Sequence, residues 1–237
     1  MNNEFAFPRI IEKFSVAGEL ISCERYGEGH INDTFKVTMD DCGREVHYIL
    51  QRINNRLFPD VDRLMHNIEL VTEFCRKSVI ERGGAPMREC LTLIRTKDGA
   101  SYTCEDGNYF RMYVFIEGAT TYQSVRDPRD FYESAVAFGK FANLLAKFDA
   151  SQLYEVLPDF HNTRVRYENF LRAVEKDVCG RAEEVRSEID WVKSRSDLCG
   201  KIVDKIASGE IPLRVTHNDT KLNNVMLDDA TGKGLAV

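Results

Sequence analysis

The fold is inferred first from the segment Val215-Thr216-His217-Asn218-Asp219-Thr220-Lys221-Leu222-Asn223-Asn224-Val225-Met226-Leu227. It has the pattern His-x-Asp, then four residues, then Asn and a short apolar run. This pattern predicts a polar loop that leads directly into a strand. Asn, Asp and Thr are also common in plain turns, so composition alone would predict only a loop. The spacing of the carboxylate and the carboxamide carries the further argument.

Asp219 and Asn224 have the side chains that phosphoryl transfer requires. A carboxylate can accept or orient the proton of an attacking hydroxyl, and a nearby Asn oxygen can hold a magnesium ion against the phosphates. Four residues separate Asp219 from Asn224, which is the spacing in the catalytic loop of protein kinases. We therefore expect a kinase-type catalytic loop here, and a simple polar turn is the alternative.

Length and composition set limits on what the chain can be. With 237 residues it could form one large domain or two small lobes. Its hydrophobic content of 43% and charged content of 30% are ordinary for a globular protein. The formal net charge of -6 argues against nucleic acid or an anionic membrane as the main partner. A nucleotide remains compatible with this charge, because a few local cations and backbone amides suffice to bind it.

Cysteine usage and the absence of targeting patterns indicate a cytoplasmic protein. The seven cysteines are odd in number and never form a Cys-x-x-Cys pair, so a disulfide scaffold and a zinc site are both poorly supported. No basic segment followed by a long apolar run opens the chain. No window approaches the roughly 20 apolar residues of a membrane span.

The first part of the sequence predicts a short helix at residues 7–14 and then a series of strands. A Gly-x-Gly loop, Gly27 to Gly29, follows the strand at residues 20–26 and leads through Asn32 and Thr34 into a second strand. Glycines allow the backbone to approach a ligand closely, which suits a lid over phosphates. A plain hairpin with a glycine turn is the alternative. Because a strand and not a helix follows the loop, a dinucleotide fold and a P-loop are disfavoured.

The third expected strand, residues 46–53, bears on the phosphate-binding cation. In a kinase-like N-lobe this strand supplies the cation that holds the phosphates. Arg52 is the only cation of the strand, whereas Gln51 stands where the basic residue is expected. Alternation along a strand allows only one of them to face a nucleotide, and the sequence does not decide which. Glu69 and Glu73, in an expected helix at residues 59–82, are the candidate acids to pair with this cation.

The remaining segments predict a hinge followed by helices. Residues 91–94 and 108–116 are expected strands, and the second ends in Glu117-Gly118. Backbone groups of Tyr113, Val114 and Phe115 would then be available to the edge of an adenine, although a simple buried strand has the same pattern. Residues 127–208 are helical in pattern. The order predicts an α+β, protein-kinase-like fold, with a β-rich nucleotide-binding N-lobe at residues 1–117 and a partial helical C-lobe at residues 118–237.

Five stretches of the sequence carry a resemblance to a known family: Gly29-His30-Ile31-Asn32-Asp33-Thr34-Phe35, Tyr48-Ile49-Leu50-Gln51-Arg52-Ile53-Asn54, Phe115-Ile116-Glu117-Gly118-Ala119-Thr120, Pro158-Asp159-Phe160-His161-Asn162-Thr163 and His217-Asn218-Asp219-Thr220-Lys221-Leu222-Asn223-Asn224. Together they resemble the small-molecule kinases related to aminoglycoside and choline kinases, and within that family the N-acetylhexosamine 1-kinases. The similarity covers nearly the whole chain.

The resemblance implies phosphorylation of the anomeric hydroxyl of N-acetylglucosamine or N-acetylgalactosamine by ATP and Mg2+. Asp219 would be the catalytic base and Asn224 a magnesium ligand. Lys221 would be a cation beside the transferred phosphoryl group, where it could offset developing charge; an exposed loop lysine is the alternative. The partners would be ATP and a small sugar, with neither nucleic acid nor membrane involved.

One feature departs from the family pattern. Members follow the catalytic loop with an Ile-Asp-x-Asp-type segment whose aspartate holds a metal, and the sequence stops at Val237, where this segment is expected. Asp228 and Asp229 lie in an expected turn and are poor substitutes. We therefore expect a C-terminally truncated chain with negligible kinase activity of its own. The alternatives are a kinase for another small acceptor (an aminoglycoside, choline or homoserine) and a non-catalytic nucleotide-binding module.

Overall fold

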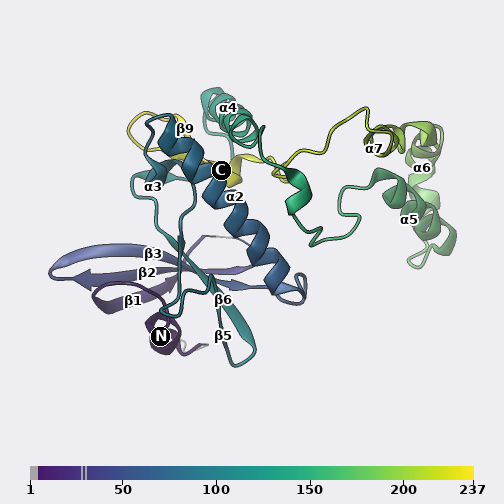
Figure 1. Ribbon diagram of the computed structural model, residues 1–237. Helices are drawn as coiled ribbons and strands as arrows, with labels where there is room; N and C mark the ends of the chain where they lie inside the picture. Colours follow the sequence, from purple (N-terminus) through teal and green to yellow (C-terminus); the bar gives the residue numbers. More distant parts are fainter. Residues whose placement is uncertain (1–4, 28, 30) are drawn as a thin grey trace. The chain divides into compact units, whose positions relative to one another are not determined.

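The computed structural model describes residues 5–27, 29 and 31–237 (Figure 1). The chain forms two compact units, one made of Met1–Val156 and Val215–Val237 and the other of Leu157–Arg214. We call them the first and second unit. The predicted lobe boundary at residue 117 stays a prediction. None of the helices in the described part of the chain has the length and the hydropathy needed to cross a membrane.

The first unit is built on an antiparallel sheet in the order β1-β2-β3-β6-β4, with β5 paired to β6. The strands are β1 (Glu19–Arg25), β2 (Asp33–Asp41), β3 (Arg44–Ile53), β4 (Leu93–Ile94), β5 (Thr103–Glu105) and β6 (Asn108–Val114). Cys42 and Gly43 connect β2 to β3 with φ values of 56° and 85°. Positive φ at both positions lets a two-residue hairpin turn match the right-handed twist of the strands. The sequence analysis missed β5 and placed β4 over a longer range.

Two helices cover opposite faces of this sheet (Figure 1). Helix α1 (Phe7–Glu12) buries Ile10 and Ile11 against Phe35, Leu50 and Phe110. On the other face, α2 (Val61–Glu81) packs its apolar stripe against the sheet, and Asp60 caps it by accepting from the N–H of Arg63 at 3.0 Å. This confirms the helix predicted for residues 59–82. The short helix α3 (Pro86–Glu89) follows.

A second, small sheet carries the end of the chain. Its strands, in the order β7-β8-β9, are β7 (Ala119–Thr120), β8 (Met226–Asp228) and β9 (Gly234–Ala236). Helix α4 (Pro128–Leu144) packs on this sheet, and Asp127 caps it by accepting from the N–H of Arg129 at 2.7 Å. A 3-10 turn, η1 (Ala150–Gln152), follows. The predicted strand after the catalytic loop is thus confirmed as β8.

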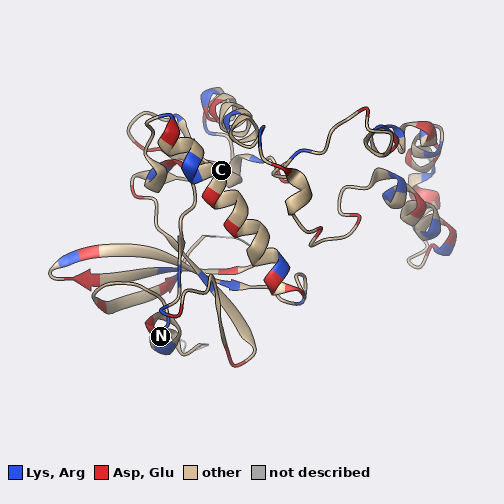
Figure 2. Ribbon diagram, viewed as in Figure 1, with Lys and Arg blue, Asp and Glu red and all other residues tan. Residues whose placement is uncertain are grey.

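The second unit is helical. It contains α5 (Thr163–Lys176), α6 (Arg186–Lys193) and α7 (Lys201–Ala207), with 3-10 turns η2 (Glu183–Val185) and η3 (Ser196–Leu198) between them. The Asn162 side chain caps α5 by accepting from the N–H of Val165 at 3.3 Å. Figure 2 shows Lys and Arg interspersed with Asp and Glu on these helices and on α2. The α+β, kinase-like fold class predicted from the sequence is confirmed.

Candidate active site

The catalytic-loop candidate belongs to the first unit and is anchored on α4. The ring of His217 lies edge-on to Phe138 and Phe141, with centroids 5.3 Å and 5.9 Å away. Its Nδ1 accepts a hydrogen bond from the backbone N–H of Asp219 at 3.3 Å. Burial lowers the pKa of His217, which favours the neutral imidazole that this hydrogen bond requires. His217 therefore holds the loop in place.

After Asp219 the chain turns toward the hydrophobic core. A 3-10 turn, η4 (Leu222–Asn224), leads into Val225 and β8. Val225 is fully buried and Leu227 nearly so, and both pack with Ala137 of α4. The apolar run that marked the motif in the sequence is thus the anchor of the loop.

Asp219, Lys221 and Asn224 form one cluster. The amide of Asn224 donates to the Asp219 Oδ2 at 2.8 Å and to its backbone oxygen at 2.8 Å. The ammonium of Lys221 lies 3.1 Å from the same Oδ2. Burial acts to raise the pKa of Asp219, but the hydrogen bonds from Asn224 and Lys221 outweigh it and lower the pKa. The carboxylate is therefore ionised at neutral pH, and both Asp219 and Lys221 are more than half exposed to solvent.

The donor chemistry of this cluster suits magnesium, which takes carboxylate and carbonyl oxygens. With its nitrogen turned to Asp219, Asn224 has its Oδ1 available on the other side of the amide. No group of three or more His, Cys, Asp or Glu side chains placed to hold a metal occurs among the described residues. Asp228 is committed elsewhere: Thr231 and Arg88 bind its two oxygens at 2.9 Å and 2.8 Å and lower its pKa.

A further contact braces the loop from the β7–α4 connection. Asn223 donates to the Oε1 of Gln123 at 2.8 Å. The sequence analysis did not single out Gln123, because nothing local in the sequence links two residues so far apart. The pairing of Ala119 with Asp228 in the small sheet brings the two segments together.

The sheet places Gln51 and Arg52, the two candidate phosphate contacts, on opposite faces. Gln51 shares the α2 face with Thr34, and its amide donates to the Thr34 hydroxyl at 3.0 Å. Its Oε1 accepts two bonds from Arg111 of β6, at 3.0 Å from Nε and 2.7 Å from Nη2. The sequence analysis missed Arg111. The sequence feature that could have pointed to Arg111 is its position as the one charged residue in the strand that ends at Val114.

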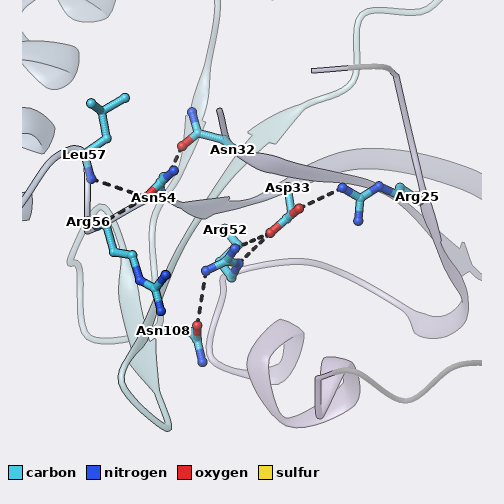
Figure 3. Close-up of polar contacts among 8 residues, drawn as sticks. All are labelled: Arg25, Asn32, Asp33, Arg52, Asn54, Arg56, Leu57 and Asn108. Carbon is cyan, nitrogen blue, oxygen red and sulfur yellow. Dashed lines mark hydrogen bonds and ion pairs between the residues drawn. The ribbon is translucent and has the colours of Figure 1, made fainter. Parts of the chain in front are cut away.

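Arg52 lies on the opposite face of the sheet, with α1 (Figure 3). Asp33 accepts from its Nε at 2.6 Å and also binds Arg25 at 2.8 Å. Burial acts to raise the pKa of Asp33, but the two arginines outweigh it and lower the pKa. Arg52 also contacts Asn108 at 3.4 Å. Arg52 therefore has a structural partner away from the α2 face.

The glycine loop is partly described. Gly27 has a φ of 74°, which favours glycine, and a Cβ there would meet nothing within 4 Å. The predicted contact residue Asn32 accepts through its Oδ1 from the backbone N–H of Asn54 at 3.0 Å (Figure 3). Gly29 is described, whereas positions 28 and 30 of the same loop lie outside the described residues.

Two groups expected at the nucleotide site have partners within the protein. Glu69 binds Arg95 at 2.8 Å, so it does not pair with a cation of the third strand in the described structure. The backbone N–H groups of Val114 and Phe115 donate to Thr92 O at 2.9 Å and His47 O at 3.3 Å, so these two groups are not free to bond an adenine.

Aromatic side chains gather at the hinge. Tyr113 is buried, and burial raises its pKa. The rings of Tyr26, beside the glycine loop, and Phe115 meet edge to face with centroids 5.6 Å apart. Lys36 Nζ lies 4.6 Å from the centroid of the Phe115 ring. Aromatic side chains thus connect the end of β1 with the hinge.

Comparison with known proteins identifies the family and supports the fold. A family model described as the phosphotransferase enzyme family (APH) matches residues 22–237. The crystal structure of spectinomycin phosphotransferase, APH(9)-Ia, in complex with ADP and spectinomycin is 13% identical, with a TM-score of 0.53. The alignment covers 91% of this chain and 62% of that chain. At this identity the likeness shows the fold alone.

A second solved structure is less similar. It is an aminoglycoside phosphotransferase from Alicyclobacillus acidocaldarius subsp. acidocaldarius DSM 446, 13% identical, with a TM-score of 0.41. The alignment covers 70% of this chain and 42% of that one. The chain therefore spans less than two thirds of the length of either structure.

Proposed function

The chain belongs to the phosphotransferase enzyme family. From this premise we propose that the protein is an ATP-dependent kinase of small molecules. The observation that carries the proposal is the cluster of Asp219, Lys221 and Asn224. It combines an ionised carboxylate, a cation and an amide oxygen on one loop anchored by buried residues. Phosphoryl transfer depends mainly on positioning and charge, and these three groups supply both.

Each residue of the cluster has a proposed role. Asp219 orients the acceptor hydroxyl and takes its proton, and its lowered pKa leaves it available as an acceptor at neutral pH. Lys221 is placed to offset negative charge on the transferred group. Asn224 would hold Mg2+ through its Oδ1 and keeps Asp219 oriented through its NH2 group. When bound, Mg2+ neutralises charge on the phosphate oxygens.

The nucleotide is proposed to lie along the α2 face of the large sheet. The supporting features are Gln51 and Thr34 on this face, the free space beside Gly27 and the aromatic contact at the hinge. Arg52 is left out of the proposed site, because it lies on the other face with Asp33.

We propose an N-acetylhexosamine as the acceptor, phosphorylated on its anomeric hydroxyl. The support is the sequence resemblance of the five stretches quoted above, one of which, residues 158–163, precedes α5 in the second unit. An aminoglycoside, choline or homoserine acceptor is an outcome of the test below.

Nucleotide binding and phosphoryl transfer test the proposal separately. Calorimetry with ATP and ADP is done on this chain. Release of ADP is measured with N-acetylglucosamine, N-acetylgalactosamine, choline, homoserine and kanamycin, in this chain and in any longer product of its gene. We expect that transfer is confined to the acetylated hexosamines. Preference for another acceptor would reassign the substrate, and ATP binding without transfer in any form would support the non-catalytic module.

The variant Asp219→Asn removes the proposed base with little change in shape. Made in the form of the protein that transfers phosphate, it should lower the transfer rate roughly 100- to 10,000-fold and leave ATP affinity within about threefold. The matched control is Asp106→Asn, in the β5–β6 turn. Asp106 has a φ of 48°, which asparagine tolerates equally well. Equal transfer rates in the two variants would exclude Asp219 as the base.

A further inference from the structure

Arg111 is a buried cation on the face of the sheet that carries Gln51. Its exposed fraction is 9%, although its strand, β6, is otherwise apolar around it. Among the described residues, no carboxylate lies within ion-pairing distance of its guanidinium. Buried arginines are normally paired with an acid, because an uncompensated charge away from water costs free energy.

The contacts of the guanidinium leave donors unused. Nε and Nη2 both donate to the single Oε1 of Gln51, at 3.0 Å and 2.7 Å. Nη1 contacts the thioether of Met65 at 3.9 Å, and sulfur is a weak acceptor. The guanidinium carbon also lies 5.5 Å from the centroid of the Tyr113 ring, a contact that uses no N–H donor and supplies no negative charge. A guanidinium carries five N–H groups in a planar fork, so the described contacts do not use its full donor capacity.

The surroundings of Arg111 indicate an anion as the missing partner. Gln51 is neutral, and its amide donates to the hydroxyl of Thr34. The series of hydrogen bonds from Arg111 through Gln51 to Thr34 of β2 therefore contains no negative charge. The cross-strand pairing of Gln51 with Arg111 places the cation directly beside the strand-three position. The planar fork of arginine fits the oxygens of a phosphate group in a bidentate arrangement.

We propose that Arg111 of β6 binds the phosphates of the nucleotide, so that the cation expected on β3 comes from the neighbouring strand. Gln51 then orients the guanidinium and is not itself the charged contact. This inference rests on the proposed function, since it names a phosphate-binding residue of the same site. It also gives the buried charge an acceptor that the described protein residues do not supply.

The test compares ligands with and without phosphate. Affinities for ADP and adenosine are measured by calorimetry in the presence of EDTA, for the wild type and for Arg111→Met and Arg111→Lys. We expect Arg111→Met to weaken ADP binding roughly 10- to 100-fold and to leave adenosine binding within about threefold. Arg111→Lys should recover part of the loss, because it restores the charge without the fork.

A control and a second readout guard against misfolding. Met112→Leu alters the adjacent, fully buried side chain on the opposite face of β6 and should leave both affinities unchanged. In the unmodified chain, the Nε–H signal of Arg111 is identified in a 15N spectrum by its loss in Arg111→Lys. We expect ADP to shift this signal and adenosine to leave it in place.

The outcomes separate this inference from the proposed function. A wild type that does not bind ADP would overturn both. A wild type that binds ADP, with Arg111→Met binding it equally and the Nε–H signal unmoved, would overturn only the role of Arg111. If Arg111→Met does not fold, Arg111→Lys and the spectrum of the unmodified chain decide the question.

Discussion

Gly234 allows the β8–β9 hairpin to contact α4 closely, and replacing it should loosen the support of the catalytic loop. A Cβ at Gly234 would lie 2.7 Å from the backbone oxygen of Glu133 and 2.8 Å from the Cβ of Ala137. Neither atom is the end of a flexible side chain, so the strand must move. The same movement would lengthen the 3.1 Å hydrogen bond from Gly234 N to Glu133 Oε2.

The magnitude follows from these contacts. Overpacking of this kind costs about 1–3 kcal/mol of unfolding free energy. For a chain of this size that lowers the melting temperature by roughly 2–12 °C. Gly139 is the matched control, because it lies within α4 and an added Cβ meets nothing within 4 Å. Gly139→Ala should gain about 0.5–1 kcal/mol, or roughly 1–4 °C, from helix propensity.

The assay is thermal unfolding followed by far-UV circular dichroism. Trp191 lies in the second unit, so its fluorescence would not report on this change directly. A double-mutant cycle adds Ala137→Gly, which removes one of the two clashing atoms and should recover part of the loss in Gly234→Ala. If Gly234→Ala leaves the melting temperature unchanged while Gly139→Ala raises it, the packing of the hairpin on α4 is not as described.

Three further predictions concern the surroundings of the site. Arg88 donates to the backbone oxygen of Glu117 at 2.6 Å and to Asp228 at 2.8 Å. Because its side chain is partly exposed, Arg88→Ala should lower the free energy of unfolding in urea by about 1–2 kcal/mol. An unchanged free energy of unfolding would show that these bonds are not held in solution. Burial lowers the pKa of His217 from its ordinary 6.5. The neutral ring therefore contributes stability that is fully present above pH 6.5 and is lost as the pH falls through the lowered pKa. Amide exchange in residues 215–225 should rise over this acidic range in the wild type, but not in His217→Gln. Burial raises the pKa of Cys75 to about 12, so iodoacetamide should label the exposed Cys42, Cys104 and Cys179 before Cys75. Labelling is followed by mass spectrometry, and early labelling of Cys75 would contradict its burial.

The features predicted from sequence were those with local causes. The helix expected at residues 59–82 begins beside its own cap, Asp60, and the helical pattern expected from residue 127 begins beside Asp127. The His-x-Asp loop could be recognised because its carboxylate, amide and anchoring apolar run lie within a dozen residues. The order of these elements then sufficed to predict the fold class.

The features that were missed depend on pairing between distant segments. Strand alternation showed that Gln51 and Arg52 face opposite sides, but only the packing of α1 and α2 shows which side each one faces. Glu69 lies in the helix that was predicted, yet its partner Arg95 comes from the loop after β4. The N–H of Val114 is used because Thr92, beside a two-residue strand, lies next to it.

The arginines on the two faces of the large sheet have partners of different charge. On the α1 side Arg52 lies 2.5 Å from the carboxylate of Asp33, and such a pair is a sufficient structural reason for a charge there. On the α2 side Arg111 is more deeply buried, yet its described oxygen contact is a neutral amide. Packing alone would favour an apolar residue at this position, since the strand around it is apolar and a buried charge is costly. The cost is explained if the α2 side is where an anion binds, and the nucleotide phosphates of the proposed reaction are such an anion.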